Sequence, residues 1–211
     1  MNIAQINEGT AALVAAGHRV FQIHRFADGD MAHLTRLERW AEIPLSARVL
    51  DMGSGTGEMA KVFAELRPDL SFTLVNLSQA QLDYSPNWMH AHCCSFCKVP
   101  EQNESFDAVM FCFSIGHENA FEAIGEAYRL LKKGGVLFIY DMVRISGSNE
   151  SMVSVEYQVN DRRTMELAAE DFRLDWYMEP QDDGSYGRRM LGAEFDEVFN
   201  GTIPAIWRFV K

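Results

Sequence analysis

The sequence predicts an α/β protein built on a doubly wound, mostly parallel sheet with helices on both faces. Short apolar runs rich in strand-forming residues alternate with segments whose apolar residues recur at helical spacing. The clearest unit is a strand at 47–52, a helix at 57–67 and a second strand at 71–77. This order and these lengths predict a parallel pair joined by a right-handed crossover.

The chain ahead of the first strand is predicted to be helical. We expect residues 1–46 to form an N-terminal helical segment and residues 47–211 to form the main domain. A helix is predicted from Asp30, as its N-cap, to about Glu42, because apolar residues recur there on one face.

A tight glycine-rich turn follows the first strand. In the stretch Arg48–Glu58, Asp51 ends an apolar run and Gly53, Gly55 and Gly57 follow at alternate positions. Glycines let the backbone turn sharply and approach a ligand, and a helix start favours negative groups. The turn therefore predicts a site for a ligand carboxylate, although an ordinary glycine-rich turn is the alternative. The spacing is neither that of dinucleotide sites nor that of a P-loop.

The rest of the chain continues the alternation of strands and helices. We predict strands at 88–93, 108–113, 136–140, 172–177 and 203–210, and helices from 118 or 119 to a stop at 134–135 and at 161–170. The fourth strand is almost continuously apolar, as a central parallel strand should be. The last strand is predicted at an edge of the sheet, because it contains Pro204.

Composition and charge limit the classes of function. The 211 residues are 47% hydrophobic and carry a formal net charge of −11. This suits one globular domain, and it lacks the basic footprint typical of nucleic-acid binders. We therefore expect a small-molecule substrate and no nucleic-acid partner. No apolar run approaches the roughly 20 residues that span a bilayer, and no secretion signal is recognised, so a cytoplasmic protein without a membrane span is expected.

The cysteines are clustered and could suggest a metal. The four cysteines stand at positions 93, 94, 97 and 112. Cys94 and Cys97 have zinc-like spacing, and His90 and His92 lie nearby, but no second pair of matching spacing follows. Packed, reduced thiols are the favoured interpretation, and no metal site is predicted.

Two stretches carry a resemblance to a known family. Val49–Gly57 resembles motif I of the class I S-adenosylmethionine-dependent methyltransferases, and Phe106–Asp141 resembles the second half of that domain. The resemblance implies a Rossmann-like sheet whose last strand is antiparallel, S-adenosyl-L-methionine as cofactor, and an N-terminal lid. Gln22, His24 or Arg25 could then contact the ligand, or could lie on a solvated helix surface.

The end of the second strand departs from the family pattern. Members usually carry an acidic residue there that accepts both ribose hydroxyls, whereas this chain has Asn76, whose amide has a single acceptor oxygen. The stretch from Leu77 to Gln81 resembles the Leu-Ser-x-x-Gln of a branch that includes cyclopropane fatty acid synthases and terpenoid C-methyltransferases. That resemblance implies that Gln81 helps to hold the ribose. Alternatively, Ser78 caps a helix and Gln81 lies on its surface.

The resemblance also implies a set of cofactor-binding positions. Ser95 stands where many members carry an aspartate for the adenine amino group, and Phe96 would lie beside the adenine. Ser114 lies at the tip of the fourth strand, which faces the methyl group in this fold. The expected cofactor-binding residues are Asp51, Gly53, Gly55, Gly57, Asn76, Leu77, Gln81, Ser95, Phe96 and Ser114.

The function expected from these residues is methyl transfer to the carbon or oxygen of a small molecule, either lipid- or isoprenoid-like or another metabolite. His117 is the first candidate for a base or substrate ligand, with a structural imidazole as the alternative, and Glu118 and Asp141 come next. A non-catalytic cofactor-binding scaffold is the competing class, motivated by Asn76 and Ser95. A nucleic-acid methyltransferase is a third.

Overall fold

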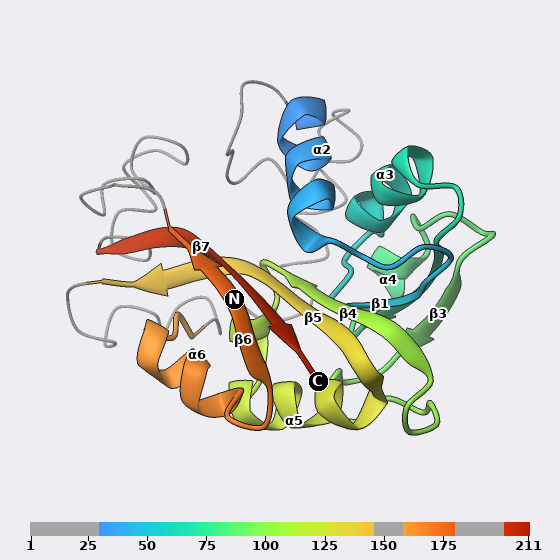
Figure 1. Ribbon diagram of the computed structural model, residues 1–211. Helices are drawn as coiled ribbons and strands as arrows, with labels where there is room; N and C mark the ends of the chain where they lie inside the picture. The colour runs from blue at the N-terminus through green and yellow to red at the C-terminus, as the bar shows by residue number, and fades with distance from the viewer. Residues whose placement is uncertain (1–29, 146–157, 180–200) are drawn as a thin grey trace.

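The structure is a computed structural model that describes residues 30–145, 158–179 and 201–211 (Figure 1). Its centre is a seven-stranded sheet in the order β3-β2-β1-β4-β5-β7-β6. The strands are β1 (Arg48–Met52), β2 (Ser71–Asn76), β3 (His90–Cys93), β4 (Phe106–Cys112), β5 (Leu131–Arg144), β6 (Arg173–Met178) and β7 (Thr202–Val210).

The pairing of the strands confirms the predicted sheet. β1 pairs in parallel with both β2 and β4, and β7 runs antiparallel to its neighbours β5 and β6. The order therefore reverses at β1, so the carboxyl ends of β1 and β4 flank the position where open α/β sheets bind ligands.

The predicted edge position of the last strand is wrong, because β7 lies between β5 and β6. Pro204 is tolerated in this inner strand for a local reason. It pairs with Met142 of β5, whereas the pairing of β6 with β7 reaches only to Met178 opposite Ile206. Within the described residues, no β6 residue therefore stands beside Pro204 to need its missing N–H.

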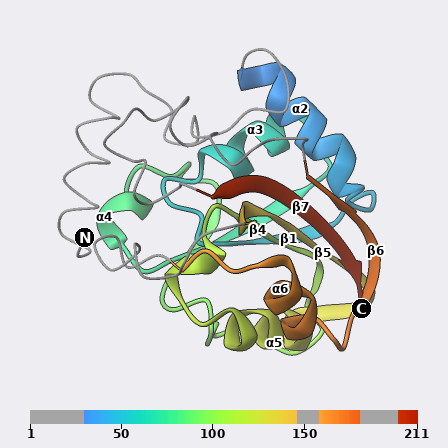
Figure 2. The same cartoon turned by 90° about the vertical axis from the view of Figure 1, so that its left-hand side faces the viewer.

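Helices cover both faces of the sheet. The α-helices are α2 (Asp30–Ala41), α3 (Glu58–Leu66), α4 (Gln79–Leu82), α5 (Ala120–Leu130) and α6 (Arg162–Ala168), with a 3₁₀ turn η1 (Ile115–His117). α2 and α3 lie on one face, and α5 and α6 lie on the other (Figures 1 and 2). Strand alternation sends Val49 into the core on the α2 and α3 side, and Leu50 and Met52 into the core on the α5 and α6 side.

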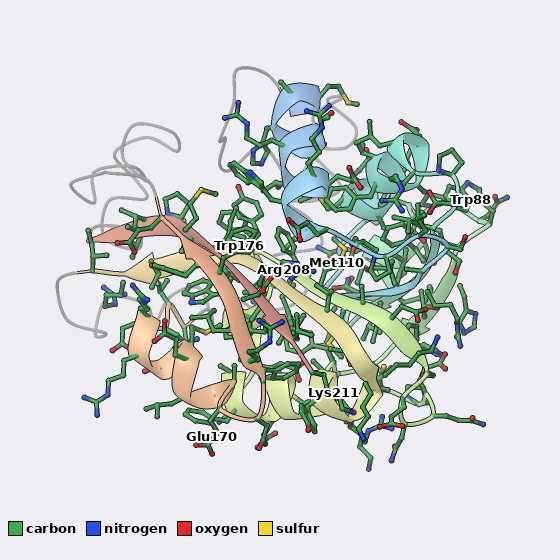
Figure 3. The ribbon with its side chains drawn as sticks, viewed as in Figure 1. Trp88, Met110, Glu170, Trp176, Arg208 and Lys211 are labelled. Atoms are coloured by element: carbon green, nitrogen blue, oxygen red, sulfur yellow. The ribbon has the colours of Figure 1, made fainter. Side chains whose placement is uncertain are left out.

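The helix α2 is packed into the core rather than lying loose above it. Leu34 and Leu37 are fully buried in the same cluster as Val49. Arg208 of β7 donates a hydrogen bond from Nε to the Ala41 carbonyl at 3.1 Å, which fixes the end of the helix to the sheet (Figure 3). The division at residues 46 and 47 and the lid role stay predictions, and the candidates at positions 22, 24 and 25 lie outside the described residues.

The fifth strand begins earlier than its sequence pattern predicts. α5 ends at Leu130, and β5 starts at Leu131 and reaches Arg144. The pairing with β4 shifts between Phe106 and Ala108. A side chain at Gly135 would stand 2.8 Å from the carbonyl oxygen of Lys132, so the Gly-Gly pair shapes this irregularity instead of ending the helix. No helix within the described ranges is long and apolar enough to cross a bilayer.

Candidate functional site

The glycine turn stands at the carboxyl end of β1, as predicted. Gly53, Gly55 and Gly57 have φ values of +81°, +57° and +75°, a region that only glycine adopts easily. The amides of Gly53 and Ser54 both donate to the Val75 carbonyl, at 2.8 and 3.0 Å. The turn is thereby fixed to the end of β2, and its shape does not depend on a ligand.

The three glycines differ in what surrounds them. A Cβ atom on Gly53 would stand 2.3 Å from the Cβ of Ser114, and one on Gly57 would stand 2.9 Å from Cδ1 of Leu74. Among the described residues, a Cβ atom on Gly55 would meet nothing within 4 Å. Gly53 and Gly57 are therefore closely packed, whereas no described side chain fills the space beside Gly55.

Asp51 is an orphaned buried carboxylate beside this turn. Its side chain is 1% exposed, and within the described residues its Oδ2 atom has no hydrogen-bond partner. Burial raises the pKa of Asp51 to about 7. A buried polar atom without a partner is rare in proteins and indicates a missing donor.

Other groups around the turn also fit the amino-acid end of S-adenosylmethionine. The Ser54 hydroxyl is buried without a partner in the described chain. The helix α3 begins at Glu58 with no side-chain cap, so its first N–H groups face the turn without a side-chain acceptor. An ammonium group for Asp51 and a carboxylate for the helix start would satisfy these groups together.

Asn76 and Gln81 form one unit at the end of β2. Asn76 donates from Nδ2 to Oε1 of Gln81 at 2.7 Å and to the Ser78 carbonyl at 3.4 Å. The Ser78 hydroxyl accepts from the Gln81 amide at 3.1 Å, so Ser78 caps α4. The side-chain amide hydrogens of Asn76 are therefore used within the protein. Its side-chain oxygen Oδ1 is the atom that it can offer to a ligand. The neighbouring Leu77 is exposed.

Ser95, Phe96 and Glu118 are joined to one another. Ser95 donates to one carboxylate oxygen of Glu118, and the Phe96 amide donates to the other at 3.0 Å. The Ser95 hydroxyl also accepts from the Cys97 amide at 3.0 Å. Phe96 is 3% exposed and its ring packs edge-on against Phe111, with centroids 5.5 Å apart. The carboxylate of Glu118 therefore holds the backbone turn at 95–97.

Ser114 and Asp141 hold the tips of three strands together. The Ser114 hydroxyl donates to the Met52 carbonyl at 2.6 Å, which joins β4 to β1. Asp141 is 1% exposed, and it accepts from the amides of Ser114, Ile115 and Met142 at 3.0, 3.2 and 2.7 Å. Its carboxylate orders the turn that follows β4.

His117 is the one of the three catalytic candidates that the structure places at the surface. It ends η1, and its amide donates to the Ser114 carbonyl at 3.1 Å. The neighbouring Gly116 carbonyl accepts from the amide of Gln158 at 2.7 Å. The turn that carries the imidazole is therefore held by hydrogen bonds at the end of β4 and to Gln158, which follows β5.

Two polar groups of this region are not among the predicted site residues. Ser54 lies inside the glycine motif, so its position alone could have marked it. Arg144 ends β5, and its Nε and one terminal nitrogen are buried without a hydrogen-bond partner in the described residues. Burial lowers the pKa of Arg144. Arg144 could have been noticed in the sequence as a cationic residue that directly follows an apolar strand.

The comparisons with known proteins agree with this geometry. A family model described as "Methyltransferase domain" matches residues 50–139. The ubiquinone/menaquinone biosynthesis C-methyltransferase UbiE of Dinoroseobacter shibae is 24% identical over 183 residues, covering 75% of this chain and 70% of that protein. The ribosomal RNA-processing protein 8 of Caenorhabditis briggsae is 28% identical over 137 residues, covering 63% of this chain and 38% of that protein. The chain thus spans well under half of the latter relative.

Solved structures show the same fold at low sequence identity. The [4+2]-cyclase SpnF superposes with a TM-score of 0.78 at 17% identity, covering 98% of this chain and 94% of that one. A geranyl diphosphate methyltransferase in complex with GPP and sinefungin gives a TM-score of 0.72 at 14% identity, covering 85% and 78%.

The expectation that nucleic acid is excluded is wrong. Several curated relatives are ribosomal RNA-processing proteins, and the 25S rRNA (adenine(645)-N(1))-methyltransferase of Schizosaccharomyces pombe is 32% identical over 96 residues, covering 44% of this chain and 27% of that protein. The inference failed because a net charge of −11 is a sum over the whole chain, whereas binding of a polyanion depends on local charge.

The glycine turn with its orphaned carboxylate, the reversal of strand order at β1 and the matched methyltransferase domain agree with one another. Residues 50–139 match the methyltransferase domain, and the described residues have the Rossmann-like fold of the class I S-adenosylmethionine-dependent methyltransferases.

Proposed function

We propose that this protein transfers the methyl group of S-adenosylmethionine to a small quinol- or isoprenoid-like acceptor. The observation that carries the methyl-donor part is the unpartnered Asp51 carboxylate beside the open side of Gly55. The acceptor part is supported by the UbiE relative, most of whose length this chain spans. The Leu77–Gln81 stretch supports it as well, because it resembles that of terpenoid C-methyltransferases.

The residues present could hold the cofactor in parts. Asp51 would accept from its ammonium group, and the start of α3 would receive its carboxylate. Asn76 and Gln81 would bind the ribose, with the adenine beside the turn at 95–97. When bound, S-adenosylmethionine supplies an electrophilic methyl group on a positively charged sulfur.

The protein's part in the transfer is to position the acceptor, exclude water and take a proton where the acceptor is a hydroxyl. We propose His117 as the group that takes the proton or binds the acceptor, since it is exposed beside the strand tips. Glu118 and Asp141 are proposed as positioning residues, because each of their carboxylates already accepts backbone amides.

A ribosomal RNA base is the second candidate acceptor. The RNA-processing relatives favour it.

The first test is binding of S-adenosylmethionine and of its demethylated product by calorimetry to the whole chain. Binding to wild type that is lost in Gly55→Val, with the fold retained by circular dichroism, is expected. No binding of either compound at millimolar concentration would overturn the cofactor assignment and favour a scaffold that keeps the fold without the cofactor. Normal affinity in Gly55→Val would place the ligand elsewhere.

The second test identifies the acceptor with methyl-labelled cofactor. Label should pass to a demethylated quinol with a short isoprenoid chain, and His117→Ala should lower the rate about 100-fold or more if the imidazole is a general base. Label passing only to a ribosomal RNA transcript would overturn the small-molecule acceptor while keeping the methyltransferase. Unchanged turnover in His117→Ala would make this residue structural.

A further inference from the structure

A second cluster of chemically active side chains lies on the opposite edge of the sheet from β6. His90 and His92 are two residues apart on the edge strand β3, so they share one face of it. Glu101 reaches them from the loop after β3. Each residue offers one ligand atom, and these atoms all lie within 4.8 Å of one another.

The three side chains are in contact with one another. The Nε2 atom of His92 lies 3.0 Å from Oε1 of Glu101, and the rings of His90 and His92 meet edge to face with centroids 4.5 Å apart. His90 is exposed and the other two are half-buried. Solvent can therefore reach the cluster from one side.

The backbone under these side chains is held in place. His90 and His92 pair with Thr73 and Val75 of β2. The Glu101 amide donates to the Val99 carbonyl at 2.8 Å, and its own carbonyl accepts from the guanidinium of Arg129 at 2.9 Å. Binding an ion would thus require little reordering of the chain, which favours affinity.

We propose that His90, His92 and Glu101 form a binding site for a divalent transition metal ion of the zinc class. Two imidazole nitrogens and a carboxylate oxygen are a ligand set that zinc, nickel and copper accept. Water would complete the coordination from the exposed side. The formal net charge of −11 adds a general attraction for cations.

The cysteines do not belong to this site. Cys93 follows His92 directly, so it faces the other side of β3, and its Sγ atom lies 3.6 Å from the Leu77 carbonyl. The Cys94 and Cys97 side chains pack against the hydrophobic core instead of facing the cluster. Within the described residues, the His-His-Glu cluster is the one group with the proximity that a metal requires.

The position of the site suggests a structural effect on the cofactor side. β3 pairs Cys93 with Asn76, and the Cys94 amide donates to the Asn76 carbonyl at 3.1 Å. An ion held by His92 would therefore stabilise the strand that supports Asn76. This site does not depend on the proposed methyl transfer, and its test uses no enzymatic readout.

The test is zinc binding to the full chain, measured by competition with a chromophoric chelator. Wild type should bind one equivalent of zinc. His90→Ala and His92→Ala should each lower the zinc affinity by about 100-fold or more, because losing even an outer partner of a metal ligand lowers affinity by about 10–100-fold. Glu101→Gln should weaken binding in the same direction, and Glu104→Gln, an exposed carboxylate in the same loop, should not.

The cysteine variant Cys94→Ser/Cys97→Ser should retain this equivalent, and the cobalt-substituted wild type should show no thiolate charge-transfer band. Circular dichroism and the metal-free melting temperature establish that each variant is folded. If His90→Ala binds zinc as tightly as wild type, or if the cysteine variant loses the ion, the proposal is overturned. Absence of any bound zinc at micromolar concentration would overturn it as well.

Discussion

Gly53 lies so close to Ser114 that a methyl group on the glycine would stand 2.3 Å from the Cβ atom and 2.9 Å from the hydroxyl of the serine. The same hydroxyl donates to the Met52 carbonyl at 2.6 Å. The glycine of the binding turn and the serine at the tip of β4 therefore form one close contact across the point where the strand order reverses. A side chain at position 53 therefore requires a smaller residue at position 114.

Gly53→Ala should lower the free energy of unfolding by about 2–4 kcal/mol, because it adds a steric clash to a φ of +81°. The double variant Gly53→Ala/Ser114→Gly removes the clash and should recover part of that loss. Urea unfolding of the two single variants and the double variant measures the coupling. Strictly additive losses would show that the two residues do not constrain each other.

Gly55→Ala should separate binding from folding. In the part of the chain that the structure describes, a Cβ atom there meets nothing within 4 Å, so the φ of +57° is what opposes it, at about 1–2 kcal/mol. The methyl group would enter the space assigned to the cofactor, so calorimetry should show affinity for S-adenosylmethionine at least about 10-fold weaker. Gly125→Ala, on an open helix surface, is the control and should leave affinity unchanged. Normal binding by Gly55→Ala would refute the assignment.

The elements around this turn could be predicted because their signals are local. An apolar run, three glycines and an amphipathic helix are adjacent in the chain, and β1, α3 and β2 form where expected. The roles of Glu118 and Asp141 could not be predicted in this way. Glu118 and its hydrogen-bond partner Ser95 are 23 residues apart in the sequence, and Asp141 and its partner Ser114 are 27 apart. The packing of the sheet, and not the local sequence, brings these residues together.

The inner position of β7 was also beyond sequence reasoning, because Pro204 indicated an edge. Pro204 is tolerated in an inner strand because the pairing of β6 with β7 ends at Ile206. The length of the neighbouring strand cannot be inferred from the residues around the proline. The His-His-Glu cluster was missed for a similar reason, since Glu101 approaches β3 only through the course of the loop after it.

Asp51→Asn should stabilise the ligand-free protein at neutral and alkaline pH. Burial raises the Asp51 pKa to about 7, above the value of about 4 in an unfolded chain. The folded state therefore binds the proton more tightly, and wild-type stability falls as pH rises from about 4 to about 7. At pH 8 the variant should be more stable by about 4 kcal/mol, and near pH 4 the two should converge.

Urea unfolding at pH 4, 6 and 8 tests this prediction, and calorimetry should show that the same variant loses affinity for S-adenosylmethionine. A destabilised Asp51→Asn at pH 8 would mean that the carboxylate has a stabilising partner in the free protein.

Asn76→Asp should raise the affinity for S-adenosylmethionine by about 10-fold. The amide of Asn76 donates to Oε1 of Gln81, and a rotated Gln81 amide can donate to an aspartate instead. A carboxylate would then accept from the ribose hydroxyls in charge-assisted hydrogen bonds, each worth about 1.5–3 kcal/mol. Asn87→Asp makes the same charge change at an exposed position and should have no effect. Weaker binding by Asn76→Asp would mean that Gln81 cannot reorient.

Ser95→Ala and Glu118→Ala should reveal a coupled pair that positions the turn at 95–97. Each variant removes a hydrogen bond to a charged acceptor, and each should cost about 1–3 kcal/mol of stability. The double variant should cost less than the sum by about 1 kcal/mol or more, because both singles break the same bond. The exposed Glu122→Ala, on the first turn of α5, is the control and should stay within about 0.5 kcal/mol of wild type.

The same pair distinguishes positioning from chemistry. If Glu118 acts through the backbone turn, Glu118→Ala should raise KM for the cofactor and change kcat little, because the reacting groups are untouched. A carboxylate that acted as the base would lose kcat instead and would give a rate that recovers with rising pH in the variant. Since both Glu118 oxygens already accept hydrogen bonds from Ser95 and Phe96, the KM effect is the expected result.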